Sequence, residues 1–267
     1  MDIRNKTIVV TGATGGIGRA VARELSDEGA TLILVARNAQ RLSGLVNELG
    51  GDRHVAVSAD ISDDAGRRDI VKACRSTGSD GISLIINAAG TNSFGWFEKQ
   101  SADAVRDLLD VNLLSPILLT LDLLPLLQQQ KSSRIINIGS TFGSIGYPGF
   151  SAYCASKFGL RGFTEALRRE LADTGTRVSY IAPRATRTDL NSDTVIAMND
   201  ELGTAMDDPA LVAEEVMRVI RGPANSDKYI GWPEKLFVRV NALFPGIVDN
   251  SLRKQLPTIR RFARSKT

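Results

Sequence analysis

The sequence is poor in the residues on which much protein chemistry depends. It has one histidine, His54, and two cysteines, Cys74 and Cys154, in 267 residues. A catalytic triad or a metal site built on histidine would have to include His54. The cysteines stand 80 positions apart with no CxxC pair, which gives no zinc or disulfide framework. We therefore expect chemistry without a metal, in a reducing compartment such as the cytoplasm.

A strong excess of charge is lacking as well. The 33 Lys and Arg against 30 Asp and Glu leave a net charge of +3, which does not indicate the clustered basic face of a nucleic-acid binder. The start of the chain shows no secretory pattern, because residues 7–11 already predict a strand. The most apolar stretch, residues 111–127, has 11 Leu, Ile or Val in 17 positions, with Asn112 and Asp122 among them. A membrane span needs about 20 apolar residues, so this stretch predicts a long buried helix.

Short apolar runs alternate along the chain with longer segments of helical period. The runs are rich in Ile and Val on both faces, which is typical of parallel strands covered by helices on each side. The strands expected are residues 7–11, 31–36, 54–59, 83–87, 134–139, 177–182 and, weakly, 228–232. Helical crossovers without a linker predict one α/β domain, a doubly wound Rossmann fold with a mainly seven-stranded parallel sheet.

Two segments depart from this alternation within the single domain, residues 1–267, whose core is residues 5–232. Residues 191–207 are polar, lack a clear period and follow a strand end, so we expect a mobile lid over a substrate. The tail, residues 234–267, mixes aromatic with basic side chains. A docked helical tail with a solvated basic face is favoured there, and peripheral contact with anionic lipid is the alternative.

The first predicted strand runs into a glycine-rich string, Thr11-Gly12-Ala13-Thr14-Gly15-Gly16-Ile17-Gly18, and a helix follows it. Glycines at a strand-to-helix turn let backbone amides approach a pyrophosphate at the positive end of the helix. A turn without a ligand is the alternative, but the flanking strand and helix favour a dinucleotide site. The contacts expected are Gly12, Thr14, Gly15, Gly16, Ile17 and Gly18.

The end of the second strand indicates which dinucleotide is bound. An acidic residue about 20 positions after the glycines would hold the ribose hydroxyls of NAD. Here the strand ends in Val35-Ala36-Arg37-Asn38. The planar guanidinium of Arg37 suits a 2′-phosphate, so we predict NADP(H), with a solvated loop position as the alternative for Arg37.

A tyrosine and a lysine follow the fifth predicted strand. Tyr153 stands 13 residues after Ser140, and Lys157 is four further on, so the phenol and the ammonium share one helix face. A nearby cation favours the phenolate. Tyr153 is then a general acid for a carbonyl oxygen that receives hydride, with Ser140 donating a second hydrogen bond. A Tyr-x-x-x-Lys motif alone could equally be a tyrosine packed over a surface lysine.

Together with Asn87-Ala88-Ala89-Gly90 and Asn112, these motifs resemble the short-chain dehydrogenase/reductase family over about residues 5–232. The resemblance implies that Tyr153 is the acid/base and that Lys157 binds the nicotinamide ribose and lowers the Tyr153 pKa. It also implies that Ser140 positions the carbonyl and that Asn112 holds a relay water. Homodimers or homotetramers through two long helices are implied too. The further cofactor contacts that it implies are Asp60, Ile61, Asn87, Ala88, Ala89, Gly90, Tyr153, Lys157, Pro183 and Thr188.

Three details leave alternatives open. Pro116 has no N–H, which frees the carbonyl of Asn112 for a water, although Pro116 could simply kink or begin a helix. Asp60 could lie near the adenine or only cap the following turn. The family usually has Pro-Gly where this chain has Pro183-Arg184, so Arg184 could reach the substrate or the cofactor.

Apolar side chains cluster at three places near the expected site. They could line an apolar pocket or pack into the core. We therefore favour NADPH-dependent reduction of an apolar ketone, aldehyde or 3-oxoacyl substrate. An NADP-dependent alcohol (steroid-like) dehydrogenase and a non-enzymatic NADP sensor or scaffold are the alternatives. The residues concerned are Ser93, Phe94, Gly95, Trp96, Phe97, Ile145, Tyr147, Phe150, Val195, Ile196, Met198 and Met206.

Overall fold

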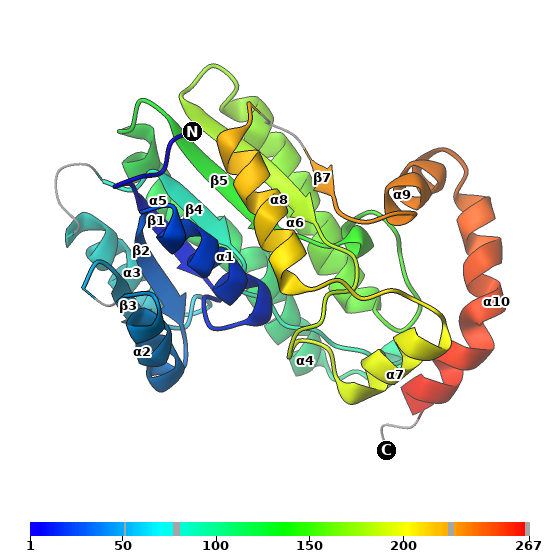
Figure 1. The fold of residues 1–267 in the computed structure, drawn as a ribbon. Coiled ribbons are helices and arrows are strands. Elements are labelled where there is room, and N and C mark those ends of the chain that lie inside the picture. The colour runs from blue at the N-terminus through cyan, green and yellow to red at the C-terminus, as the bar shows by residue number, and fades with distance from the viewer. Residues whose placement is uncertain (51, 77–80, 224–226, 265–267) are drawn as a thin grey trace.

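A computed structural model describes residues 1–50, 52–76, 81–223 and 227–264 of the chain. Seven strands form one parallel sheet in the order β3-β2-β1-β4-β5-β6-β7, which confirms the predicted fold (Figure 1). The weakest predicted strand, β7, is shorter than expected because Gly231 turns the chain with a φ of +96°. The strands are β1 (Thr7–Thr11), β2 (Thr31–Ala36), β3 (Val55–Ser58), β4 (Leu84–Asn87), β5 (Ser133–Ile138), β6 (Thr176–Ala182) and β7 (Lys228–Tyr229).

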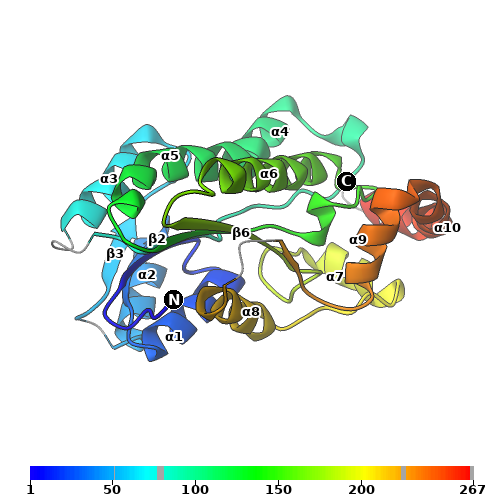
Figure 2. The same cartoon turned by 90° about the horizontal axis from the view of Figure 1, so that it is seen from above.

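Helices cover both faces of the sheet (Figure 2). Successive strand residues point to opposite faces, so Ile8 and Val10 of β1 pack with α1 and α8. Val9 packs with α3 and α5 on the other side. This double burial explains why the strands lack a polar face. The covering helices are α1 (Gly16–Asp27), α2 (Ala39–Glu48), α8 (Pro209–Arg221), α3 (Asp64–Ser76), α5 (Ser115–Gln128) and α6 (Ser151–Glu170).

The strand order reverses at β1, which pairs in parallel with β2 on one side and β4 on the other. Val10 lies opposite Leu34 in one register and opposite Ile86 in the other. Connections that leave two neighbouring strands in opposite directions open a crevice at their carboxyl ends. The glycine-rich turn after β1 and the Asn87 segment after β4 meet at this crevice.

The apolar stretch near residue 111 belongs to a longer helix. It comprises α4 (Ala102–Leu109), a π-helical turn η2 (Asp110–Leu114) and α5. Residues 102–128 are long and apolar enough to cross a membrane, but the core helix of a soluble protein passes the same test. Leu119 and Leu123 are fully buried against the sheet, whereas Leu121 is 64% exposed. The prediction of a buried helix is therefore correct for one face only.

The expected lid contains a helix, α7 (Asp193–Glu201), which begins after a Ser192 cap. The sequence missed it because its buried stripe is short, with Val195 and Met198 as its buried apolar residues. The segment returns to the body at Asp207, which bridges to Thr186. Mobility of this segment stays a prediction.

The tail forms α9 (Glu234–Leu243) and α10 (Pro245–Arg264), which lie along the edge of the molecule beyond β7 (Figure 1). Ile259 of α10 is fully buried, and the Tyr147 hydroxyl donates to Gln255 Oε1 at 3.0 Å. Through residue 264 the tail is therefore docked, as the sequence favours. Residues 265–267 lie outside the described residues.

His54 has a structural role. Its Nδ1 accepts the Leu32 amide at 3.2 Å, and its Nε2 lies 3.2 Å from the Leu49 carbonyl and 3.0 Å from Ser26 Oγ. Burial lowers the pKa of His54, which keeps the neutral ring that this arrangement requires. The imidazole thus joins α1, β2 and the end of α2 on the side of the sheet where β2 and β3 lie.

Candidate active site

The glycine-rich turn is packed so closely that side chains would collide there. Gly12 has a φ of +63°, and a Cβ on it would lie 2.7 Å from the backbone of Ala89. A Cβ on Gly18 would lie 2.2 Å from the Gly12 oxygen. Gly15 precedes α1 in an extended conformation and offers no side-chain cap. The first amides of α1 are therefore left for an anionic ligand at the positive end of the helix.

Neighbouring loops complete this crevice. Thr11 Oγ1 accepts the amides of Ala88 and Ala89 at 3.1 and 3.2 Å, which fixes the chain after β4 against the glycine turn. A Cβ on Gly16 would lie 2.5 Å from Thr188 Cγ2, so Thr188, one of the expected cofactor contacts, borders the same crevice. Thr11 was missed as a site residue, although its place at the end of β1 was a usable signal.

The predicted nucleotide-selecting residues lie next to one another. Arg37 is exposed directly after β2. Asp60 accepts Ser62 N at 2.9 Å and Ser62 Oγ at 2.6 Å, so it caps the turn, as one of its two interpretations held. Hydrogen bonds from Ser62 and, more weakly, the charge of Arg37 lower the Asp60 pKa. The side chain of Ile61 is buried in the core, so a contact from Ile61 would have to come from its backbone.

Asn87 and Pro183 form hydrogen bonds within the protein at the strand ends that border the crevice. Asn87 Nδ2 donates to Asn137 Oδ1 at 2.8 Å and to Thr120 Oγ1 at 3.3 Å. The Pro183 carbonyl accepts Thr141 N at 2.9 Å, which joins the end of β6 to the segment after β5. Their contribution to a cofactor would therefore be the placement of backbone.

Ser140, Tyr153 and Lys157 converge as predicted. Ser140 follows β5. Its hydroxyl accepts Phe142 N at 3.1 Å and acts to lower the pKa of the nearby Tyr153 phenol. Tyr153 and Lys157 lie one turn apart on α6, with the lysine Nζ 5.8 Å from the centre of the tyrosine ring. The ammonium donates to the Ile138 carbonyl at 3.2 Å. All of these groups lie where the parallel strands end.

Burial sets the proton affinities of the pair. It raises the pKa of Tyr153 to about 12, against a smaller opposing effect of the Ser140 hydrogen bond. It lowers the pKa of Lys157 to about 8. Desolvation therefore dominates the pKa of the phenol, and the expectation that Lys157 lowers this pKa stays a prediction. At neutral pH the phenol carries its proton.

Asn112 lies in the π turn and is buried. Its Oδ1 accepts Thr91 N at 2.7 Å, and its Nδ2 donates to Thr91 O at 2.8 Å and to Ser156 Oγ at 3.2 Å. A Cβ on Gly90 would lie 3.2 Å from Asn112 Oδ1 and 3.8 Å from Lys157 Nζ. Gly90 therefore marks the point at which the asparagine and the lysine meet.

Pro116 lies in the first turn of α5, so it does begin a helix. It also has no N–H to offer the Asn112 carbonyl. The preceding Ser115 bonds back to the Asp110 carbonyl through its amide and through its hydroxyl, the latter at 2.6 Å. The geometry accommodates both interpretations of Pro116, and the relay water stays a prediction.

Tyr180 of β6 is a further functional residue that the sequence did not reveal. Its hydroxyl accepts Ser140 N and donates to Ser140 O, both at 3.1 Å. A Cβ on Gly139 would lie 1.9 Å from the Tyr180 ring. Tyr180 therefore holds the backbone of Ser140 in place, a role visible only once β5 and β6 are paired.

Arg184 does not extend toward the crevice, which answers the question left by its departure from the family pattern. Its guanidinium forms two bonds to Asp207, at 2.6 and 2.9 Å. It also donates to the Trp232 carbonyl at 3.2 Å. The cation is thus occupied in tying together the loop after β6, the end of the α7 segment and the start of the tail.

The expected pocket residues divide between core and cavities. Phe94, Phe150, Val195 and Met198 are buried in one cluster with Tyr153, so for them the core interpretation is correct. Ile196 and Met206 line a cavity of about 420 Å³ together with Thr188.

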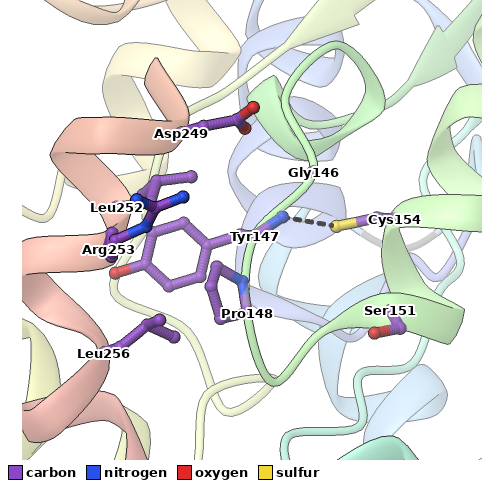
Figure 3. Close-up of a pocket in the computed structure, with 9 residues that line it drawn as sticks. All are labelled: Gly146, Tyr147, Pro148, Ser151, Cys154, Asp249, Leu252, Arg253 and Leu256. Atoms are coloured by element: carbon purple, nitrogen blue, oxygen red, sulfur yellow. Dashed lines mark hydrogen bonds between the residues drawn. The ribbon is translucent and has the colours of Figure 1, made fainter. Parts of the chain in front are cut away.

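A second cavity, of about 460 Å³, lies between α10 and the loop after Ser140. Figure 3 shows Tyr147 and Pro148 of the loop facing Leu252 and Leu256 of α10. Cys154, on α6, also lines this space, and its Sγ accepts the Tyr147 amide at 3.4 Å. The cavity walls therefore combine the segment that leads to Tyr153 with the tail.

Comparison with known proteins agrees with this geometry. The family model for short chain dehydrogenases matches residues 6–198. The chain is 30% identical over 259 residues to the ketoacyl reductase HetN of Nostoc sp., which covers 94% of this chain and 89% of that protein. It is 34% identical over 199 residues to a 3-oxoacyl-[acyl-carrier-protein] reductase of Bos taurus, covering 74% and 81%.

A solved structure shares the fold. It is a short chain dehydrogenase/reductase from Burkholderia phymatum in complex with NAD, with a TM-score of 0.82, 21% identity and coverage of 92% of this chain and 96% of that one. The chain belongs to the short-chain dehydrogenase/reductase family of oxidoreductases. Its cofactor is accordingly a nicotinamide dinucleotide.

Tyr180→Phe should lower kcat about tenfold with little change in nucleotide affinity, because the Ser140 backbone loses both partners and shifts. The free energy of unfolding should fall by about 1–3 kcal/mol for the unpaired groups. Steady-state kinetics, nucleotide titration and urea unfolding measure the three quantities. Tyr229→Phe, which removes a hydroxyl bonded to Ser144 at 2.8 Å, is the control. An unchanged kcat in Tyr180→Phe would show that this hydroxyl does not position Ser140.

Proposed function

We propose that the protein reduces the carbonyl group of an apolar ketone, aldehyde or 3-oxoacyl substrate with NADPH. The observation that carries the proposal is the convergence of Ser140, Tyr153 and Lys157 at the crevice edge of the sheet. Gly90 borders Lys157 and Gly12 borders Ala89 there, so the reacting groups and the nucleotide turn adjoin one another. The ketoacyl and 3-oxoacyl reductases among the relatives support the reaction class.

The site has the features that a dinucleotide requires. The glycine turn leaves backbone amides and a helix N-terminus for the pyrophosphate, and Gly90 keeps a Cβ from filling the space beside Asn112 and Lys157. Thr188 lies against Gly16, where it could hold a carboxamide. Arg37 is free of the sheet and offers a guanidinium to a 2′-phosphate.

The chain's own residues would handle the proton. When bound, the cofactor supplies the hydride that reaches the carbonyl carbon. Ser140 and Tyr153 present two hydroxyls to the carbonyl oxygen, and Tyr153 donates the proton that completes the alcohol. Lys157 holds the ribose. After Tyr153 has given up its proton, Lys157 and a water held near Asn112 would pass a replacement proton to the phenol.

The ketoacyl and 3-oxoacyl reductases among the relatives favour reduction over alcohol oxidation. A non-enzymatic sensor would not need Ser140, Tyr153 and Lys157 together. The cavity beside α10, whose wall includes Tyr147, Leu252 and Leu256, supports an apolar substrate, whereas the cavity with Ile196 and Met206 is also lined by Arg187, Asp189 and Asp200.

Tyr153→Phe should lower the rate of carbonyl reduction about 100-fold or more, because the hydride transfer loses its proton donor. NADPH affinity should stay within about twofold, since the phenol ring remains. A panel of ketones and acyl thioesters, followed by NADPH absorbance, measures the rate. Tyr147→Phe, which keeps the ring that lines the second cavity, is the matched control. If the wild-type protein turns over none of the panel, the sensor interpretation replaces this proposal.

Arg37→Asp should reverse the nucleotide preference. The variant loses the guanidinium and places a carboxylate beside the 2′-phosphate. The kcat/KM with NADPH should therefore fall by about tenfold or more relative to that with NADH. The ratio of kcat/KM for the two cofactors measures the effect, with Arg75→Asp on the exposed side of α3 as the control. Comparable kcat/KM values for NADPH and NADH in the wild-type protein would contradict the proposed specificity.

We also propose a cytoplasmic homo-oligomer that pairs through α5 and α6, which lie side by side on one face of the sheet (Figure 2). Leu114 and Leu121 on the long helix and Phe158 on α6 are exposed, which supports an apolar contact between copies. Leu121→Asp should reduce the molar mass measured by light scattering to half of the wild-type value or less. Leu211→Asp on α8 should leave the molar mass unchanged. A wild-type protein that is already monomeric would contradict this pairing.

A further inference from the structure

The helix α9 has the reverse of the usual amphipathic arrangement. Its docked face consists of Val238, which is buried, Asn241, which donates to the Ser144 carbonyl at 2.9 Å, and Glu234, which pairs with Arg184. At about 100° per residue these three positions share one side of the helix. The side attached to the protein is therefore largely polar.

The opposite side of α9 is apolar and faces solvent. Leu236, Val240 and Leu243 follow the i, i+4, i+7 spacing of a single stripe, and Leu243 is 72% exposed. Exposed apolar side chains continue on both ends of the helix. We call the following six residues the α9 apolar surface: Trp232, Leu236, Phe237, Leu243, Phe244 and Ile247, all of which are exposed. Single exposed leucines are ordinary, but a run of this kind marks an interaction surface.

Positive charge flanks this surface on α9 itself. Residues 234–264 contain seven Lys or Arg against two acids, Glu234 and Asp249, but Arg260 and Arg261 of α10 contact Trp96 and Glu201 instead. Glu234 already pairs with Arg184. Lys235 and Arg239 flank the apolar stripe on α9 and take part in no ion pair within the described part of the chain. Lys254 is exposed on α10, whose inner side is held by Ile259.

We propose that the α9 apolar surface binds the face of an anionic lipid bilayer. Aromatic and aliphatic side chains that reach into the acyl boundary, with flanking cations at the headgroups, are the combination that interfacial helices use. A second copy of the chain fits less well, because a twofold contact would bring Lys235 and Arg239 of both copies together. Helix α9 lies at the outer edge of the molecule (Figure 1).

Co-sedimentation of the full chain with vesicles tests this directly. The wild-type protein should pellet with vesicles of phosphatidylcholine and phosphatidylserine at low salt, much less with phosphatidylcholine alone, and less at high salt. Leu243→Ser should weaken partitioning about tenfold, through loss of one inserted side chain. Leu211→Ser, which changes an exposed leucine on α8 outside the α9 apolar surface, should leave vesicle binding unchanged.

A charge variant keeps the test decisive if Leu243→Ser unfolds. Lys235→Glu with Arg239→Glu changes two exposed side chains and should abolish the preference for phosphatidylserine while the thermal unfolding temperature stays near that of the wild type. Wild-type protein that remains in the supernatant with the anionic vesicles at low salt would overturn the proposal. So would light scattering in which Leu243→Ser converts a dimer to a monomer, since the occupant would then be a second copy.

Discussion

The parallel pairing of β1 with both β2 and β4 is the constraint from which the rest of the structure follows. In this register Thr11 lies opposite Asn87, so the chain leaving β1 and the chain leaving β4 emerge side by side. Only glycine permits that approach, since a Cβ on Gly12 would collide with the backbone of Ala89. Because β5 continues the same sheet, Ser140 emerges at the same edge, and α6 returns across it with Tyr153 and Lys157. The catalytic groups and the nucleotide turn are brought together by backbone hydrogen bonding before any of their side chains interact.

At this edge of the sheet, burial is the main influence on the pKa values of Tyr153 and Lys157. The phenol and the ammonium are both removed from water, and their pKa values move in opposite directions, the first up to about 12 and the second down to about 8. A phenol that keeps its proton at neutral pH can donate it to a substrate. A lysine whose pKa is about 8 can both lose and regain a proton near neutral pH. Desolvation is the largest cause of both shifts. Ser140 opposes the rise for the phenol, and the Tyr180 hydroxyl holds the Ser140 backbone by two hydrogen bonds.

The sequence predicted the parts of this arrangement that local patterns determine. Strands buried on both faces show as continuous Ile and Val, and the glycine string and the Tyr-x-x-x-Lys spacing are contiguous in the chain. What it could not predict depends on pairing between distant segments. Tyr180 looks like any aromatic residue of a strand until β6 lies beside β5. The position of Thr11 at a strand end marked it as a candidate, but its partners, amides 77 and 78 positions away, follow only from the pairing of β1 with β4. The α7 helix was missed because two buried residues make too short a stripe to read as a period.

Arg184 shows how a departure from the family pattern can be compensated. A glycine there would leave the loop after β6 free, whereas the guanidinium binds Asp207 through two bonds, the Trp232 carbonyl and Glu234. Its stem passes so close to Gly231 that a Cβ there would lie 2.7 Å from Arg184 Cδ. A bidentate, largely enclosed pair of this kind is stronger than a surface ion pair. Asp207, at the end of the segment that contains α7, and Glu234, the first residue of α9, therefore share one cation. The tail also contributes Leu252 and Leu256 to the wall of the cavity beside the loop that leads to Tyr153.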